Sequence, residues 1–331
     1  MSASPRNGAS SPSVAAPAAG RSANSERLRA RAVWLYYAEG MKQNEIAEAL
    51  GTTRVTIVRL LADARRRNEV RITISSSMAE LAGLEVEISR RYGIEDVIIC
   101  PSSDVVSDPT QSIAASAGAY LGGLMQPGMS VGVGWGKTLH SMLQFIESQT
   151  LSDLSVVSLL GGFSHVRHFN PADFAWRFAE LFQGEGYLVP APALVDSPET
   201  KRALIESCGI GEVFDKARNL DMVLLSVGGI AKGSTSFQTG YLSDAERKDL
   251  KAAGAVGDLL YNFIDAEGRL VDHSVNERTI SVSLEQLANA KARILVSGGP
   301  EKVDVLHGAI AAIRPSALVT DDASAKALLA M

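Results

Sequence analysis

The residues best suited to bind an anion lie in the stretch SVGVGWGKTL, residues 130–139. Glycines let a ligand approach backbone N–H groups, while Lys137 and Thr138 add a cation and a hydroxyl. The nucleotide-binding loop G-x-x-x-x-G-K-[ST] requires its first glycine at position 131, which is a valine here. The nearest glycine, Gly132, leaves three residues before Gly136. The stretch therefore offers phosphate-binding chemistry without the spacing of an ATPase loop.

Lys137 and Trp135 each leave two interpretations open. The ammonium of Lys137 would neutralise a phosphate, which we favour. A buried and partly deprotonated Lys137 would instead form a Schiff base with an open-chain aldehyde. Trp135 would either stack on a sugar ring or pack the glycine-rich loop.

Two other patterns point to chemistry only weakly. His165 and His168 are three residues apart, but no carboxylate or cysteine set accompanies them, so a solvated loop is favoured over a metal site. The stretch GFSHV, residues 162–166, lacks the second glycine of a nucleophile elbow. We therefore expect no metal, no cofactor and no catalytic residue.

Strands and helices alternate from Met78 onward, and they must position these residues. Near-continuous apolar strands separated by helices predict an α/β fold, a doubly wound and mostly parallel sheet covered on both faces. The strands are expected at residues 95–100, 129–134, 154–162, 186–192, 221–229, 292–299 and 316–320. In such sheets, ligands bind beyond the carboxyl ends of the strands. Three of these strands end in the glycine pairs 161–162, 228–229 and 298–299, which favours a small-molecule site there.

The charge distribution divides the chain, although the net charge is only −5. Residues 21–73 carry eleven Lys or Arg against six Asp or Glu, a net charge of +5. Residues 74–331 carry twenty against thirty-one, a net charge of −11. A small basic segment joined to a large acidic one suggests a nucleic-acid-binding module fused to a different domain.

The basic segment has the spacing of a helix-turn-helix. Leu28 and Ala32 begin the apolar face of a first helix, which Gly40 ends. Ile46 and Ala47 turn inward in a second helix, and the following glycine at position 51 permits the tight turn into a third helix, residues 53 to about 68.

The third helix carries the residues expected to meet DNA, because its N-terminal part enters the major groove in this motif. Its arginines would pair with guanine edges or phosphates, its valines would touch thymine methyl groups, and the arginines at its end would grip the DNA backbone. The expected DNA contacts are Gln43, Thr52, Thr53, Arg54, Val55, Thr56, Val58, Arg59, Arg65 and Arg66. Residues 70–74 alternate like a strand, consistent with a small wing.

The remaining composition limits the classes of protein. The first 20 residues include five Ser, six Ala, three Pro and two Gly, which predicts a disordered tail and not a signal peptide. Cys100 and Cys208 cannot build a disulfide framework, so reduced thiols in a cytoplasmic protein are expected. No apolar run approaches the roughly 18 residues of a membrane helix, so no membrane partner is expected.

The order of motifs resembles the SorC family of sugar-binding transcriptional regulators, the type of the central glycolytic gene and deoxyribonucleoside regulators. The matching stretches, from about residue 28 to 329, include YYAEGMKQNEIAEALG, GVGWGKTL, LLGG, YLVPAPALVDSPE, TGYLSDAERKDLKAAGAVGD, FIDAEGRLVD and VSGGPEKVDVLHGAI. The resemblance implies an effector domain like the sugar-phosphate isomerase and glucosamine-phosphate deaminase fold. It also implies a homotetramer that binds operator DNA.

The resemblance further implies a set of effector-binding residues. Residues 134–138 match the loop that receives the effector's phosphate, Asp258 the acidic position that accepts hydrogen bonds from sugar hydroxyls, and Lys302 a basic contact. Residues 234–238 match a lid or rim. The expected effector-binding residues are Gly134, Trp135, Gly136, Lys137, Thr138, Gly162, Ser236, Asp258 and Lys302. Tyr261 and Asn262 depart from the usual Gly-Arg, so the identity of the effector is not implied.

These observations give one preferred hypothesis and two alternatives. We expect a disordered tail over residues 1–25, a helix-turn-helix DNA-binding domain, winged-helix-like, over 26–75, and an effector and oligomerisation domain over 76–331. The chain would be a regulator of carbohydrate or polyol catabolism genes, controlled by a sugar or polyol phosphate. The alternatives are a sugar-phosphate isomerase or deaminase with a DNA-binding appendage, and a DNA-binding scaffold that has lost its ligand.

Overall fold

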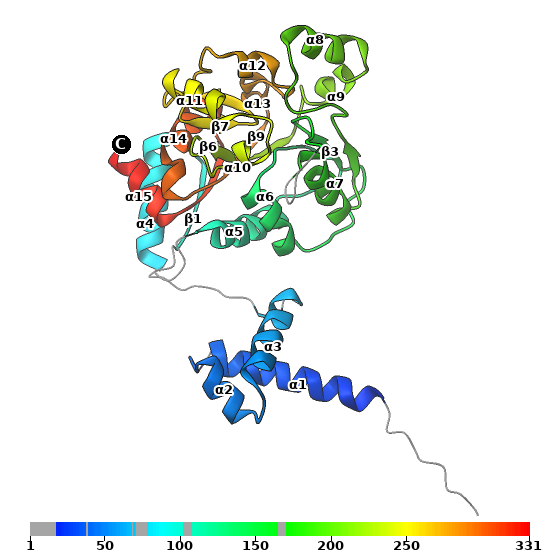
Figure 1. The fold of residues 1–331 in the computed structure, drawn as a ribbon, viewed down its shortest axis with the longest axis vertical. Helices are drawn as coiled ribbons and strands as arrows, with labels where there is room; N and C mark the ends of the chain where they lie inside the picture. Colours follow the sequence, from blue (N-terminus) through cyan, green and yellow to red (C-terminus); the bar gives the residue numbers. More distant parts are fainter. Residues whose placement is uncertain (1–17, 38, 68, 71–77, 102–107, 165–169) are drawn as a thin grey trace, which may run out of the picture. The chain divides into compact units, whose positions relative to one another are not determined.

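A computed structural model describes residues 18–37, 39–67, 69–70, 78–101, 108–164 and 170–331 (Figure 1). The chain divides into two compact units between Ile74 and Ser75, and each is described by itself. The expected strand over residues 70–74 and the pair His165 and His168 fall, apart from Val70, outside the described residues.

The smaller unit is a bundle of three helices: α1 (Ala18–Tyr37), α2 (Gln43–Ala49) and α3 (Arg54–Arg66). The two glycines expected to end helices, Gly40 and Gly51, have φ of +65° and +62°. The expectation of a disordered tail over residues 1–25 is wrong for residues 18–25, because α1 already begins at Ala18. Alanine is the best helix former, and Ala18, Ala19 and Ala23 are among the first six residues of this helix.

The core of the smaller unit lies where the expected apolar faces meet. Ile46 of α2 and Ile57 of α3 are fully buried against Ala32 of α1. The guanidinium of Arg29 donates two hydrogen bonds of 2.5 Å to the carboxylate of Glu69, which joins the middle of α1 to the residues after α3.

The larger unit is built on a seven-stranded parallel sheet with the order β1-β10-β9-β5-β2-β3-β4. Its strands are β1 (Asp96–Cys100), β2 (Ser130–Val133), β3 (Ser155–Ser158), β4 (Glu185–Tyr187), β5 (Met222–Leu225), β9 (Ala292–Val296) and β10 (Ala317–Asp321). From β2 the chain adds strands outward to β4, then returns to the other side of β2 with β5. The doubly wound arrangement expected from the sequence is thus present.

Helices cover both faces of this sheet (Figure 1). Alternate residues of one strand serve the two cores, as Leu224 and Leu225 of β5 show. One face is covered by α5 (Thr110–Gly122), α6 (Lys137–Met142) and α7 (Pro171–Leu181). The other is covered by α4 (Met78–Tyr92), α9 (Gly211–Lys216), α13 (Leu284–Ala288), α14 (Val303–Ile313) and α15 (Asp322–Ala330). The remaining helices are η1 (Leu143–Phe145), α8 (Pro198–Ser207), α10 (Thr235–Gln238), α11 (Asp244–Ala252), α12 (Ser274–Arg278) and η2 (Pro300–Lys302).

A second, antiparallel sheet of three strands was not expected. The segment 221–229, predicted as one strand, is divided between β5 and β6 (Val227–Gly229). β6 pairs with β7 (Gly257–Leu259), which forms a hairpin with β8 (Asn262–Ile264). The division places the residues just after β5 at the join between the two sheets.

The strand predicted over residues 186–192 is wrong beyond Tyr187, where β4 ends. Pro190 and Pro192 have no N–H to donate to a ladder, so the segment cannot continue as a paired strand. Gly162, predicted within the preceding strand, forms an isolated bridge to Pro192.

Two neighbouring β-branched residues of α3 give a test of the smaller unit's core. Ile57 is fully buried, while Val58 is 46% exposed. We expect Ile57→Ala to lower the free energy of unfolding of this unit by about 2–5 kcal/mol, because it leaves a cavity. Val58→Ala should change it by at most about 0.5 kcal/mol. Hydrogen exchange of α3 amides in the full chain measures both, and equal protection in the two variants would contradict the packing.

Candidate functional site

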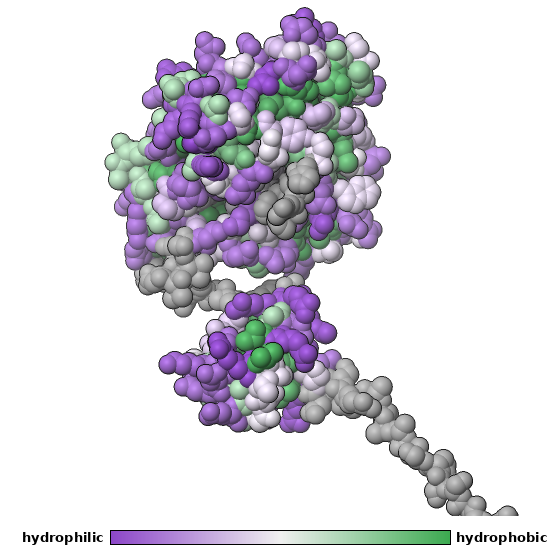
Figure 2. All heavy atoms as spheres, viewed as in Figure 1, coloured by the Kyte–Doolittle hydropathy of each residue, from purple (hydrophilic) through white to green (hydrophobic). Residues whose placement is uncertain are grey.

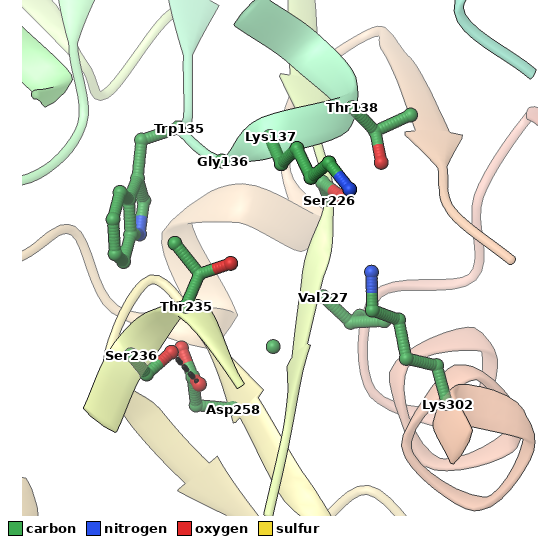
Figure 3. Close-up of a pocket in the computed structure, with 11 residues that line it drawn as sticks. Trp135, Gly136, Lys137, Thr138, Ser226, Val227, Thr235, Ser236, Asp258 and Lys302 are labelled. Atoms are coloured by element: carbon green, nitrogen blue, oxygen red, sulfur yellow. Dashed lines mark hydrogen bonds between the residues drawn. The ribbon is translucent and has the colours of Figure 1, made fainter. Parts of the chain in front are cut away.

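A pocket lies in the larger unit where the direction of sheet winding reverses, between β2 and β5. Parallel sheets bind ligands outside the carboxyl ends of strands at such a point. The loop after β2 and the segment after β5 form two of its walls, and side chains from α10, β7 and η2 complete it (Figure 3). The lining residues are Trp135, Gly136, Lys137, Thr138, Ser226, Val227, Gly228, Thr235, Ser236, Asp258 and Lys302.

Lys137 is the first residue of α6, and its side chain is about half exposed, at 47%. Gly136 precedes it with a φ of +130°, a conformation that favours glycine, so the chain turns sharply from β2 into the helix. The ammonium donates a 2.5 Å hydrogen bond to Asp108. Burial acts to raise the pKa of Asp108, but the hydrogen bonds from Lys137 and Thr110 and the charge of Lys137 lower it to about 2. A half-exposed, ion-paired lysine does not fit the buried, deprotonated lysine that a Schiff base requires.

Lys302 enters the same pocket from the opposite side. Figure 3 shows the Nζ atoms of Lys137 and Lys302 directed into one space. Burial lowers the pKa of Lys302, while the carboxylates of Glu301, Asp108 and Asp258 act to raise it. Within the described ranges its ammonium makes no hydrogen bond or ion pair.

The turn that carries Lys302 is fixed by a buried carboxylate. The N–H of Gly299 donates to Asp321 Oδ2 and to Ser324 Oγ, each at 2.9 Å. Ser324 Oγ in turn donates to Asp321 Oδ2 at 2.7 Å. These bonds tie the end of β9 to the end of β10, and they set where η2 begins.

Asp258 lies at the other end of the pocket and is 1% exposed. Its Oδ1 accepts a 2.6 Å hydrogen bond from Ser236 Oγ, and its Oδ2 accepts one of 2.9 Å from the N–H of Tyr261. Burial raises the pKa of Asp258 to about 6, although these two bonds and the charge of Lys302 act to lower it. Each carboxylate oxygen keeps a lone pair that can accept from a ligand hydroxyl.

Gly228 allows the strands to approach closely enough to form this end. A Cβ built on Gly228 would lie 2.3 Å from Asp258 Oδ1 and 2.5 Å from Ser236 Oγ. Any side chain there would separate the carboxylate from the serine, so the site itself requires glycine at position 228 of the predicted pair 228–229.

Trp135 both lines the pocket and packs the loop. Its position is therefore compatible with stacking on a sugar ring and with packing of the glycine-rich loop. It is 6% exposed, and its ring centroid lies 4.9 Å from that of Phe163 and 5.7 Å from that of Tyr261. Trp135 therefore forms part of the pocket wall, and the rings of Phe163 and Tyr261 pack against it.

Two of the predicted effector-binding residues lie off the pocket wall. Gly134 continues β2, and its N–H donates to the carbonyl of Leu224 at 2.8 Å. The backbone of Gly162 exchanges hydrogen bonds with Ala191 and Ala193. The glycine pair at residues 161–162 therefore allows close backbone pairing and does not line the pocket. The lining residues Ser226 and Val227 were not predicted as site residues. Gly228 and Thr235 belong to the predicted glycine pair and to the expected rim segment 234–238, but neither was among the expected effector-binding residues.

The turn between β7 and β8 carries backbone strain beside the site. Leu260 and Tyr261 have φ of +56° and +61° and are 1% and 0% exposed. For residues other than glycine this conformation costs about 1–2 kcal/mol each. Asn262 offsets part of it, because its Nδ2 donates to the carbonyl of Leu259 at 3.1 Å and to Ser281 Oγ at 3.0 Å.

The smaller unit presents the predicted DNA-contacting residues at the start of α3. Val55 is 78% exposed although it is apolar, and Figure 2 shows an apolar patch over α3 among hydrophilic residues. Thr53 caps the helix by accepting from the N–H of Thr56 at 3.3 Å. Arg54 Nε donates to Gln43 Oε1 at 3.4 Å, so a side chain of α2 orients this arginine of α3. The N–H of Thr52 donates to the carbonyl of Ala47, so Thr52 serves the turn.

The arginines near the end of α3 have partners within the unit. Arg65 donates to the phenol oxygen of Tyr37 at 2.8 Å, and Arg66 pairs with Asp63. Arg59 lies exposed without a partner among the residues described, so it is the arginine of this surface best placed to bind a new group.

Comparisons with known proteins bear on both units. Residues 76–330 match a family model described as "Putative sugar-binding domain", and residues 23–69 match one described as "Homeodomain-like domain". The deoxyribonucleoside regulator of Bacillus subtilis is 31% identical over 92% of this chain and 97% of its own length. The chain belongs to the SorC family of sugar-binding transcriptional regulators.

Further members agree along nearly the whole length of this SorC-family chain. The crystal structure of the full-length sorbitol operon regulator SorC from Klebsiella pneumoniae superposes with a TM-score of 0.69 and 27% identity, covering 92% of this chain and 99% of that one. The erythritol catabolism regulatory protein EryD of Brucella abortus is 28% identical over 92% of this chain and 96% of its own. These two proteins and the deoxyribonucleoside regulator are all regulators, which confirms the hypothesis of a transcriptional regulator over that of a sugar-phosphate enzyme.

The described part of the chain lacks two kinds of feature. It has no group of three or more His, Cys, Asp or Glu that could hold a metal ion. Among its helices, none combines the length and apolarity needed to cross a membrane.

The raised pKa of Asp258 predicts a pH-dependent stability. A carboxyl that binds its proton more tightly when folded stabilises the protein at low pH, and this contribution is lost as pH rises. Between about pH 4 and 6 the contribution of Asp258 to the free energy of unfolding should fall by on the order of 3 kcal/mol. Asp258→Asn cannot titrate and should lack this slope. Urea unfolding of both proteins across this range measures it, and parallel curves would contradict the assignment.

Proposed function

We propose that the chain binds operator DNA under the control of a phosphorylated sugar or polyol held in the pocket at the end of β2 and β5. The observation that carries this proposal is the convergence of Lys137 and Lys302 at one end of a pocket whose other end holds Asp258 and Ser236. The relatives are named for a deoxyribonucleoside, sorbitol and erythritol, which supports control of sugar or polyol catabolism genes.

The cationic end fits a phosphate. An ammonium without a counter-ion, beside a second ammonium, is stabilised by an anion that both can contact. Thr138 is buried in the wall next to Lys137 and adds a hydroxyl donor. A dianionic phosphate would form ion pairs with both lysines, and it would compete with Asp108 for Lys137.

The other end fits hydroxyl groups. Ionised Asp258 accepts hydrogen bonds only, so it suits the O–H donors of a sugar or polyol. Ser226, Thr235 and Ser236 can donate or accept, and Trp135 offers an apolar surface for C–H groups. A free phosphate would leave this end of the pocket unused.

Ligand entry must change the pocket. The cavity volume is about 20 Å³, which is enough for about one water molecule. A sugar phosphate therefore binds a more open arrangement, and this differential affinity supplies the coupling between effector and operator. A tenfold change in operator affinity needs only about 1.4 kcal/mol.

The remaining expectations belong to the same proposal. We place the protein in the cytoplasm, where operator DNA is reached, as a homotetramer assembled through residues 76–331. Paired helix-turn-helix units would then meet the half-sites of a palindromic operator. The effector domain would resemble the sugar-phosphate isomerase and deaminase fold, and the DNA-binding domain a winged helix.

The phosphate end gives a direct test. We expect Lys302→Met to weaken binding of the sugar or polyol phosphate at least tenfold, because it removes one of two cations. Lys291→Met is the matched control, since Lys291 is an exposed lysine paired with Asp221. A thermal-shift screen of phosphorylated sugars and polyols against their free forms identifies the ligand, and calorimetry gives its affinity. Equal binding of free and phosphorylated forms would sink the proposal.

The recognition surface gives a second test. An operator is first selected from random duplexes, and binding is then measured by fluorescence anisotropy. Arg59→Ala should cost about 1–3 kcal/mol on the selected site and relax its sequence preference, whereas Arg65→Ala should weaken all duplexes alike and lower the salt slope by about 1. Arg27→Ala on α1 is the control. If Arg59→Ala leaves the preference intact, α3 does not read the bases as proposed.

A further inference from the structure

The β7–β8 turn has side chains where its conformation favours glycine. A two-residue hairpin loop with positive φ at both positions is normally built from Asn, Asp or Gly. Here the two residues are Leu260 and Tyr261, both buried. Backbone strain at two consecutive buried positions beside a pocket suggests that the side chains of these residues have a role at the site.

Tyr261 connects the turn to α10. Its phenol O–H donates to the carbonyl oxygen of Ser236 at 2.5 Å and lies 2.6 Å from the hydroxyl of Thr239. Its N–H donates to Asp258 Oδ2 at 2.9 Å, and Ser236 Oγ donates to Asp258 Oδ1 at 2.6 Å. One residue therefore contacts the carboxylate, the serine that binds it and the end of the helix that carries the serine.

α10 needs such support from outside. It is a single turn of four residues, and its N-cap Ser234 makes no side-chain capping bond. An isolated turn of this length does not hold its conformation in water, because the first hydrogen bond must fix several residues. The helix nevertheless presents both Thr235 and Ser236 to the pocket (Figure 3).

We propose that Tyr261 is a positioning residue for the hydroxyl-binding end of the pocket: its phenol fixes α10, and so sets where Thr235 and Ser236 meet the ligand. This inference rests on the proposed function, because it assigns this end of the pocket to the sugar or polyol part of the effector. The phosphate end is held separately, since none of the hydrogen bonds among the described residues joins Tyr261 to Lys137 or Lys302.

Tyr261→Phe separates this role from simple core filling. The variant keeps the ring that packs against Trp135 and Phe163 and loses only the hydroxyl. Tyr241→Phe is the matched control. Its ring also contacts Phe163, and its hydroxyl also joins two groups, the N–H and Oγ of Ser164, but Ser164 does not line the pocket.

The experiment has one readout without ligand and one with two probes. Hydrogen exchange by mass spectrometry follows the amides of residues 235–239 in the full chain. Calorimetry compares inorganic phosphate with a panel of five- and six-carbon sugar and polyol phosphates. We expect Tyr261→Phe to speed exchange at 235–239 about tenfold and to weaken the bound sugar or polyol phosphate about tenfold, with inorganic phosphate unchanged. Tyr241→Phe should alter none of these quantities.

Each outcome decides one of the two ideas. Unchanged exchange at 235–239, or an equal loss for inorganic phosphate, would overturn the positioning role. If Tyr261→Phe exchanges faster but the wild-type protein binds none of the panel, the role of Tyr261 in fixing α10 is supported and the sugar-phosphate effector is overturned. Thr239→Val removes the phenol's partner from the helix side, and it should reproduce the selective loss even if Tyr261→Phe folds poorly.

Discussion

The pocket depends on an electrostatic constraint, the meeting of two ammonium groups in a space too small for much water. Lys137 forms an exposed ion pair with Asp108. Such a pair contributes at most about 1 kcal/mol to stability, so a ligand can readily replace Asp108. Lys302 has no such partner within the described ranges, and burial lowers its pKa. Because like charges repel and desolvated charges are costly, the arrangement is most stable when an anion bridges both. The opposite sign is found at the other end, where Asp258 is buried and accepts hydrogen bonds. A ligand that satisfies both ends is an anion joined to hydroxyl groups.

The fold supplies this arrangement by bringing together segments distant in sequence. Lys137 follows β2, Lys302 follows β9, and Asp258 belongs to a different sheet. The division of one apolar run into β5 and β6 joins the two sheets at the pocket, and Gly228 permits the approach. Parallel strands end at a common edge, so loops after separate strands need no long reach to share a ligand. The second sheet adds a buried carboxylate, Asp258, whose oxygens can still accept from a ligand.

Much of this could be predicted from the sequence, because apolar periodicity and glycine spacing act locally. The three helices of the smaller unit and their buried faces follow from Ala32, Ile46 and Ile57, and the parallel strands follow from continuous apolar runs. The capping box of Ser243 and Glu246 at the start of α11 depends on an equally local spacing. The β7–β8 hairpin could not be predicted in this way. Its turn residues, Leu260 and Tyr261, are chosen by tertiary contacts against local preference, and its strands are three residues long. Likewise, nothing in the spacing distinguished Gly162, which pairs backbone with backbone, from Gly228, which admits a carboxylate.

The same strained turn bears on how a closed pocket can serve a sensor. A pocket that admits about one water molecule must give up existing contacts when a larger ligand enters. The contacts available to give up are the ion pair of Lys137 with Asp108 and the hydrogen bonds around α10. The ion pair is weak and exposed, whereas the hydrogen bonds around α10 are buried and anchored by Tyr261. We therefore expect the ion pair at the cationic end to break first, while the hydroxyl-binding end keeps its shape. An effector would then be admitted by its phosphate and selected by its hydroxyls. Selection by buried hydrogen-bonding groups is the stricter of the two, because a ligand that lacks a matching hydroxyl leaves Asp258 or Ser236 without a partner.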